Sequence, residues 1–203
     1  MKTWTNTLGI YFERRMAKIF LLGFISGFPW VLIGTALSLW LKEEGLNRST
    51  IGWAGLIFSV YAVNFLWAPL IDKIKIPLLT RKFGSRKSWI LLCQIMILTS
   101  LFLWSCLSPD ENLSLVIGFG LLIATFSATQ DIAIDAFRIE LAKSYEEAAM
   151  AAGAAVAVVG WWTGFKIGGI LSLYSAESFQ KAGFENYWPV SYTHLTLPTK
   201  RIV

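Results

Sequence analysis

Five long apolar segments, separated by short polar or charged stretches, dominate the pattern of hydrophobic and polar residues along the chain. Each is about as long as the roughly 20 residues that an α-helix needs to cross the hydrocarbon core of a bilayer. The pattern therefore predicts an all-α, polytopic membrane protein. The predicted transmembrane helices cover about residues 19–41, 50–71, 88–107, 113–137 and 148–174.

The two ends of the chain differ from this apolar body. Residues 1–18 carry four Lys or Arg residues against one Glu, which fits a short amphipathic segment along a membrane surface. Residues 19–188 contain all five predicted helices. Residues 189–203 are too polar and proline-containing to cross a bilayer, and the string resembles a translated sequencing adapter. We predict that this tail is not native and exclude it from the fold.

The composition favours a membrane protein over a soluble domain. Of the 203 residues, 55% are hydrophobic and 15% are charged, whereas a soluble domain carries about 25% charged residues. The net charge is +5, and twelve Lys and Arg residues fall in loops on one side of the predicted helices against two on the other. By the positive-inside rule this bias places the amino terminus in the cytoplasm, and it explains the basic charge without nucleic acid. The two Cys residues and the single His lack further metal ligands nearby, so we expect no metal and no other cofactor.

The fourth apolar segment ends in two carboxylates, Asp131 and Asp135. Because they are four residues apart, they share one face of a helix. Ionisable groups are expensive inside a bilayer, which favours a coupling or gating site, and Arg138 is placed to pair with Asp135. Asp131 could bind a proton, contact a substrate, or only fix the cytoplasmic end of its helix; these alternatives stay open. Asp72 lies at the membrane edge beside several cations and is predicted to be a conformational latch.

Two further polar residues lie inside predicted helices. Asn64, in the second helix, fits either a hydrogen bond between helices or a substrate ligand. Lys166 is the only cation deep inside a predicted span. It could snorkel to the interface, bind an anionic substrate or pair with a carboxylate. Both residues are therefore candidates for substrate binding.

Small residues predict where helices pack closely. Gly23 and Gly27 form a GxxxG pair in the first predicted helix, and Pro29 can bend that helix near the middle of the membrane. Such a bent helix would either line a cavity or only pack against its neighbours. In the fifth predicted helix, glycines at every fourth position give a flat face for packing. They are Gly160, Gly164 and Gly168.

Two motifs resemble the major facilitator superfamily. Asp72-Lys73 followed by Gly84-Ser85-Arg86-Lys87 is similar to the signature between its second and third helices, with a longer spacing than usual. The glycine series is similar to its fifth-helix motif, with Phe165 in place of the usual proline. The resemblance implies an amino-terminal half of six helices, with the substrate between two halves. Since five helices cannot close such a half, we expect this chain to be a fragment that does not transport by itself.

Three more segments narrow the resemblance to the AmpG-like muropeptide transporters: residues 22–29, 65–72 and 128–138. The last is the most specific, because Gln-Asp-x-x-x-Asp-Ala at the end of a fourth helix is unusual. The resemblance covers about residues 18–188. It adds Gln130 and Trp162 to the substrate-binding candidates. In that family a basic residue lies at or near the position of Trp162, whereas here the cation is one turn further on.

By this resemblance, the complete protein is a monomer in the bacterial inner membrane that imports anhydro-muropeptides, the products of cell-wall turnover, by proton symport. Its expected partners are membrane lipid, the glycopeptide substrate and protons. The alternatives are a transporter of another anionic solute, such as an acetyl-CoA-type substrate, and a non-transporting membrane regulator. An intramembrane aspartyl protease takes its two acids from facing helices, whereas Asp131 and Asp135 share one helix. We therefore expect no enzyme.

Overall fold

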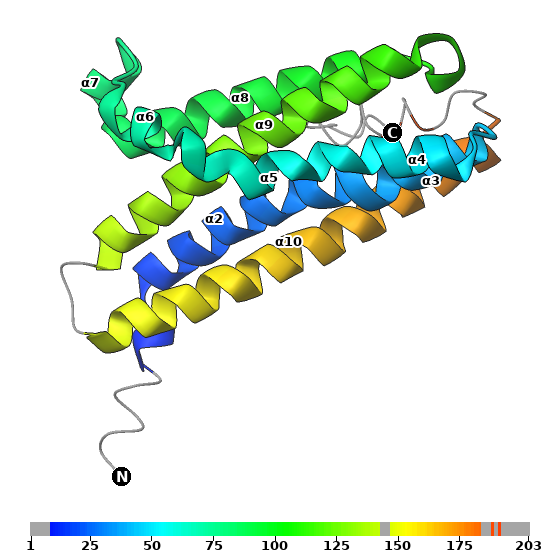
Figure 1. Cartoon of the computed structure of the whole chain (residues 1–203). Helices are drawn as coiled ribbons and strands as arrows, with labels where there is room; N and C mark the ends of the chain where they lie inside the picture. The colour runs from blue at the N-terminus through cyan, green and yellow to red at the C-terminus, as the bar shows by residue number, and fades with distance from the viewer. Residues whose placement is uncertain (1–8, 143–146, 184–187, 189–190, 192–203) are drawn as a thin grey trace.

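The computed structural model describes residues 9–142, 147–183, 188 and 191, and throughout these residues the regular structure is helical, with no strand. Five helical segments that are long and apolar enough to cross a membrane run back and forth along one direction (Figure 1). They are Arg14–Glu43, Arg48–Leu66, Ser85–Trp104, Pro109–Leu141 and Ala148–Lys181. The prediction of an all-α protein with five membrane-spanning helices is confirmed for the described part of the chain.

The first segment is one long helix with a local irregularity. It starts as α2 (Arg14–Val31), widens into the π-helical turn η1 (Leu32–Ala36) and ends as α3 (Leu37–Glu43). Pro29 lies just before the π-helical turn and has no N–H to donate to the carbonyl group four residues earlier. Shifts of the hydrogen-bond ladder at such positions are a common source of irregular turns.

The second segment differs most from its prediction as a single helix over residues 50–71. Its α-helical pieces alternate with the 3₁₀ turns η2 (Gly55–Phe58) and η3 (Asn64–Leu66). The α-helical pieces are α4 (Arg48–Ala54), α5 (Ser59–Val63) and α6 (Ala68–Lys73). Pro69 lies in the first turn of α6, where a missing N–H is tolerated, whereas within a helix a proline removes a hydrogen bond and kinks or breaks the helix. The residues that flank η3 accordingly leave α-helical geometry, with ψ values of 2° at Val63 and 0° at Trp67.

A short helix and three long ones follow: α7 (Leu79–Phe83), α8 (Ser85–Trp104), α9 (Pro109–Ala142) and α10 (Glu147–Lys181). Asn112 has non-helical backbone angles and separates a first turn at residues 109–111 from the continuous helix, which begins at the predicted residue 113. α10 continues past the predicted end at residue 174. Helices outrun the apolar pattern because the pattern marks only the part inside hydrocarbon, whereas helices continue into the interfaces.

α2 and α10 lie side by side along most of their length (Figure 1). Their backbones approach so closely that glycine is needed on both helices. A Cβ atom at Gly23 or Gly27 would overlap a carbonyl group of α10, and one at Gly160 or Gly164 would overlap a carbonyl group of α2. Further along the two helices, a Cβ atom at Gly168 would meet side chains of α2 instead of its backbone. The helix pair is therefore fixed in register by the glycine faces that the sequence contains.

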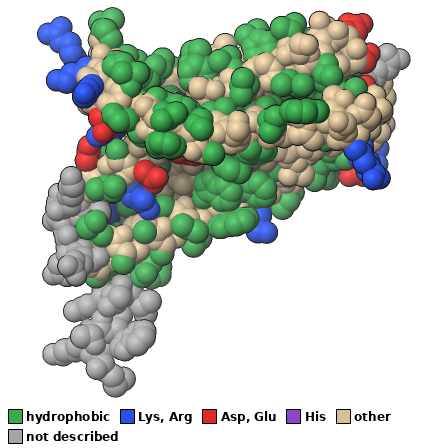
Figure 2. Space-filling model, in the orientation of Figure 1, with side chains coloured by type: hydrophobic (Ala, Val, Ile, Leu, Met, Phe, Trp, Pro, Cys, Tyr) green, Lys and Arg blue, Asp and Glu red, His purple; other side chains and the backbone are tan. Residues whose placement is uncertain are grey.

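Large apolar side chains cover much of the outer surface. Figure 2 shows hydrophobic side chains spread over the visible face, with most charged side chains toward its ends. Soluble monomers rarely expose apolar area on this scale, whereas lipid-facing surfaces are apolar. Strongly exposed examples are Trp53, Phe65, Leu66, Ile170 and Tyr174. Residues 1–8, and the predicted tail 189–203 apart from Ser191, lie outside the described residues.

Candidate functional site

A hollow of about 320 Å³ lies between α2, α9 and α10, and both predicted carboxylates line it. This volume is at the lower end of the roughly 300–1,000 Å³ that small-molecule sites occupy. One hydroxyl group, two carboxylates and one guanidinium group face it among apolar neighbours. The lining residues are Gly23, Ser26, Asp131, Ile134, Asp135, Arg138, Ala157, Val158 and Trp161.

Asp131 accepts one hydrogen bond from a side chain in the described part of the structure. The Ser26 Oγ atom donates to its Oδ1 atom over 2.5 Å and so joins α2 to α9. Among the described residues, no Lys or Arg forms an ion pair with this carboxylate. Asp131 can therefore change its protonation state without breaking an ion pair. Ser26 was not among the predicted site residues, although its place in the sequence near the packing residues Gly23 and Gly27 marks it as a polar residue on an interface.

The expected pairing of Arg138 with Asp135 is present. The Arg138 Nη2 atom lies 3.0 Å from the Asp135 Oδ1 atom. The Asp135 side chain is 64% exposed and the Arg138 side chain 24% exposed. The pair therefore lies at the open side of the hollow, whereas Asp131 lies deeper. The two carboxylates share one face but have different surroundings.

An aromatic cluster adjoins the hollow and was missed in the sequence analysis. The Trp30 ring centroid lies 4.4 Å from that of Tyr61 and 5.6 Å from that of Trp161. Trp161 in turn stacks on Phe165 at 5.5 Å and meets Trp162 edge-on at 5.1 Å. The sequence signal is an aromatic residue in each of three different predicted helices, which only the fold brings together.

Trp30 Nε1 is a buried polar atom of this cluster that has no hydrogen-bond partner among the described residues. The Tyr61 hydroxyl group lies near Ser127 and near the Asp131 carboxylate. Buried polar groups are nearly always paired with protein, water or ligand. The Trp30 N–H group therefore offers a hydrogen-bond donor to a polar group that enters the cluster.

The other substrate-binding candidates are placed in different surroundings. Gln130 is fully buried against α8, where its Nε2 atom donates to the Gln94 Oε1 atom at 2.9 Å and to the Ile90 carbonyl oxygen at 3.1 Å. Trp162 is 51% exposed at the edge of the aromatic cluster, and Lys166 is exposed one turn further along α10. Asn64 is half-buried at the break η3. Trp162 thus belongs to the cluster, whereas Gln130 faces α8.

A second charged cluster joins α6, α8 and α9 at one end of the helices. Arg86 pairs with Asp72 through Nη1, and its Nε atom lies 3.1 Å from the Glu140 Oε1 atom. Asp72 was predicted to be a conformational latch beside several cations, and the structure pairs it with one of them, Arg86. Glu140 was missed, since no local spacing connects it to a loop more than fifty residues earlier.

We expect Arg86→Gln to lower the free energy of unfolding more than either Asp72→Asn or Glu140→Gln, because it removes both ion pairs. Exposed pairs are each worth about 0.2–1 kcal/mol, so the loss should be small and should shrink at high salt. Thermal unfolding of the purified protein at low and high salt measures the loss, with Lys82→Gln in the neighbouring helix α7 as the control. An Arg86 effect that does not depend on salt would contradict the ion-pair account.

Comparison with known proteins gives a consistent result. The sequence model of the Major Facilitator Superfamily matches residues 19–193. The chain is 34% identical over 182 residues to the "Anhydromuropeptide permease" of Escherichia coli (strain K12), which covers 89% of the chain and 35% of that protein. It is 36% identical over 168 residues to the "Putative transporter AmpG 4" of Rickettsia felis, which covers 83% of the chain and 40% of that protein. The chain thus spans less than half the length of these relatives.

Proposed function

Because the chain belongs to the major facilitator superfamily and is AmpG-like, we propose that the complete protein imports anhydro-muropeptides across the bacterial inner membrane together with protons. The family assignment rests on a match that covers most of the chain, and it agrees with the five apolar helices. The matched family consists of multi-pass membrane transporters and points to a transporter rather than an enzyme. The substrate, the direction of transport and the proton coupling are the proposal.

The hollow and the adjoining aromatic cluster support a glycopeptide substrate. Sugar rings present apolar C–H faces and polar edges, and the indole ring of Trp162 is exposed where a sugar could stack on it. The exposed ammonium group of Lys166, one turn away, could pair with a carboxylate of the peptide part. The buried Trp30 N–H group could donate a hydrogen bond to a hydroxyl or amide oxygen of the substrate.

The observation that carries the proton coupling is the setting of Asp131. This carboxylate lines the hollow between three helices, is held by one serine hydroxyl group and has no cationic partner among the described residues. We propose that Asp131 binds a proton when the cavity faces the periplasm and releases it to the cytoplasm. Asp135 with Arg138, and Asp72 with Arg86, would hold the gate at the cytoplasmic end through ion pairs that open and close with the cycle.

We also propose how the protein is oriented in the membrane and that it acts as a monomer. The amino terminus lies in the cytoplasm, because the loops on its side carry the excess of Lys and Arg. The complete transporter works as a monomer, with two halves that rock around the central site. Membrane lipid, the glycopeptide and protons are its partners.

Uptake of labelled anhydro-muropeptide into vesicles tests the proposal directly. Vesicles that contain the complete protein should accumulate the label when a proton gradient is applied. Without the gradient, the label should only equilibrate. Labelled acetyl-CoA serves as the competing anionic solute. Uptake of acetyl-CoA in place of muropeptide would replace the proposed substrate, and uptake of neither solute would favour a membrane regulator.

A further inference from the structure

The Ser26 hydroxyl group has a choice of two hydrogen-bond acceptors. Serine and threonine side chains within a helix commonly donate to the carbonyl oxygen four residues earlier. Thr125 and Thr163 do so, at 2.8 Å and 2.6 Å. For Ser26 the corresponding acceptor is the carbonyl oxygen of Leu22, yet its hydroxyl group donates to the Asp131 carboxylate of another helix. The bond between helices is therefore preferred over the local one.

The strength of this bond depends on the charge of the carboxylate. A hydrogen bond from a hydroxyl group to a carboxylate is about 2.5–2.7 Å long and about twice as strong as one between neutral groups. The Ser26 Oγ and Asp131 Oδ1 atoms are 2.5 Å apart, which is the length expected for the ionised form. When a proton adds to a carboxylate oxygen, this advantage is lost and the Leu22 carbonyl oxygen competes for the hydroxyl group. The serine keeps its own proton in both states.

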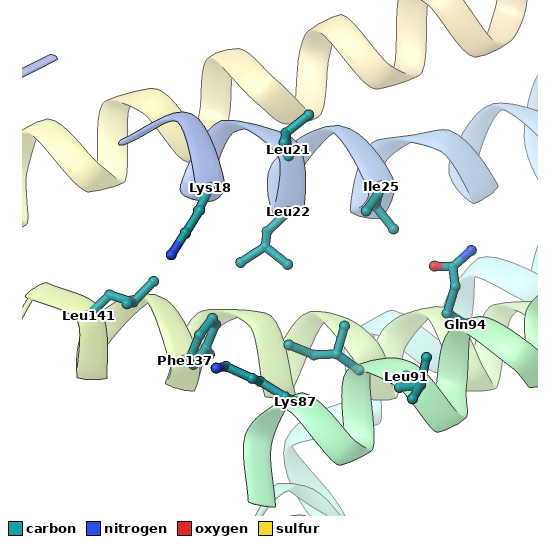
Figure 3. A pocket seen from close by; sticks show the side chains of 10 residues that line it. Lys18, Leu21, Leu22, Ile25, Lys87, Leu91, Gln94, Phe137 and Leu141 are labelled. Atoms are coloured by element: carbon teal, nitrogen blue, oxygen red, sulfur yellow. The ribbon is translucent and has the colours of Figure 1, made fainter. Parts of the chain in front are cut away.

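Ser26 lies where α2 is held from two sides. Gly23 and Gly27 bring the backbone of α2 against that of α10, and the Ser26 hydroxyl group joins α2 to α9. Nearer the start of α2, Leu22 and Ile25 face a cavity of about 570 Å³ between α2, α8 and α9 (Figure 3). Whatever fills this space in the complete protein, the contact at Ser26 joins α2 to α9 with a strength that depends on one proton.

The helix is irregular just after Ser26. Pro29 has no N–H group, so it cannot donate the usual helical hydrogen bond to the Ile25 carbonyl oxygen. The π-helical turn η1 (Leu32–Ala36) follows. Prolines and π-helical turns are positions where helices bend, and π-helical turns are frequent at functional sites. The part of α2 that carries Ser26 can therefore change its angle to the rest of the helix.

We propose that Ser26 is a positioning residue that transmits the protonation state of Asp131 to α2. With Asp131 ionised, the serine hydroxyl group ties α2 to α9. With Asp131 protonated, it turns to the Leu22 carbonyl oxygen and releases α2. Proton binding shifts a conformational equilibrium only through a contact whose free energy differs between the two states, and this bond is such a contact. The inference rests on the proposed proton coupling at Asp131 and adds the contact that converts it into movement.

Other titratable groups also face Asp131 and have to be separated from it. They are Tyr61 of α5, Cys93 of α8, and Asp135 and Arg138 of α9 itself. Within the described residues, α2 and α10 contribute no titratable side chain to the lining of the hollow. A pH response that belongs to Asp131 disappears in Asp131→Asn, whereas a response of the other groups remains.

The distance between α2 and α9 in the complete protein tests the inference. Spin labels on Ala17→Cys of α2 and Ile139→Cys of α9, both exposed positions, report this distance by electron paramagnetic resonance. Cys106 is exposed and is replaced by serine, whereas Cys93 is buried and does not react with the label. The measurement needs no substrate, so it does not depend on which solute the protein carries.

The labelled protein with Ser26 and Asp131 intact should show a distance that lengthens as the pH falls. In Ser26→Ala the distance should be long at every pH, as in Asp131→Asn. Ser26→Thr keeps the hydroxyl group and should restore the response. Thr125→Val is the matched control, because the Thr125 hydroxyl group donates to the Leu121 carbonyl oxygen of its own helix. The control should keep the full pH response.

Transport measurements separate this inference from the proposed function. Ser26→Ala should lose the roughly tenfold accumulation that a gradient of one pH unit supports, while exchange of substrate continues. Ser26→Thr should recover accumulation, and Thr125→Val should keep it. A loss of exchange in Ser26→Ala that Ser26→Thr does not rescue would mean that Ser26 is only structural.

A normal pH response of the distance in Ser26→Ala, or its loss in Thr125→Val, would overturn the inference and leave the proposed function standing. A distance in the otherwise wild-type protein that does not change with pH would overturn it as well. The opposite result separates the two in the other direction. If the complete protein accumulates no muropeptide but its distance still responds to pH through Ser26 and Asp131, the proposed function is wrong and the role of Ser26 is supported.

Discussion

Asp131→Asn in the complete protein is expected to abolish gradient-driven accumulation of anhydro-muropeptide while exchange of substrate across the membrane continues. Asparagine keeps the size of the side chain and can still accept the hydrogen bond from Ser26, but it cannot bind and release a proton. One proton per substrate and a gradient of one pH unit support about tenfold accumulation. In the variant the ratio of inner to outer concentration should fall to one, and vesicle uptake and counterflow assays measure both quantities.

Asp135→Asn is the matched control for this experiment. It makes the same chemical change one turn further along α9 and removes the ion pair with Arg138, but it leaves Asp131 in place. This variant should change the rate of uptake and keep the accumulation ratio. Accumulation that persists in Asp131→Asn would show that this carboxylate does not couple transport to protons. Loss of exchange together with accumulation would favour a structural role for Asp131.

Gly27→Ala and Gly164→Ala are expected to destabilise the fold strongly. At both positions the added Cβ atom would overlap a backbone carbonyl group of the facing helix, which can yield only if α2 and α10 move apart. Overpacking typically costs about 1–3 kcal/mol and sometimes more, and a backbone obstacle places these positions at the upper end. Thermal unfolding of the protein in detergent, followed by size-exclusion chromatography, measures the loss.

Gly118→Ala provides the control with the opposite sign. Gly118 also lies within a long helix, α9, but no atom lies within 4 Å of a Cβ atom built there. Alanine should therefore stabilise the helix by about 0.5–1 kcal/mol, because glycine has the greater conformational freedom to lose. Equal effects at the three positions would contradict the account that close backbone contact requires Gly27 and Gly164.

Several features could be predicted because they depend on residues that are close in the sequence. The five apolar segments predict five membrane helices, since hydrocarbon requires a minimum length of apolar helix. The spacing of Asp135 and Arg138 predicts their ion pair, because residues three apart are neighbours on a helix. The glycines at every fourth position mark a packing face in the same way.

Other features depend on contacts that no local spacing encodes. Arg86 binds both Asp72 and Glu140, and the second partner is brought to it only by the packing of α9 against α8. Gln130 follows Thr129 and precedes Asp131 in the sequence, yet it faces α8, because consecutive helical residues point about 100° apart. The break in the second segment could have been read from Pro69, and its shape depends on how each piece packs.

The sequence by itself determined the class of protein, the number of membrane helices and the positions of the ionisable groups along them, because hydrophobicity and helical periodicity are local properties. The tertiary structure decided which groups share a site. It placed Ser26 beside Asp131, although the two residues are 105 positions apart, and it brought Glu140 to Arg86. Such contacts arise from the relative placement of whole helices, which depends on all their packed side chains together.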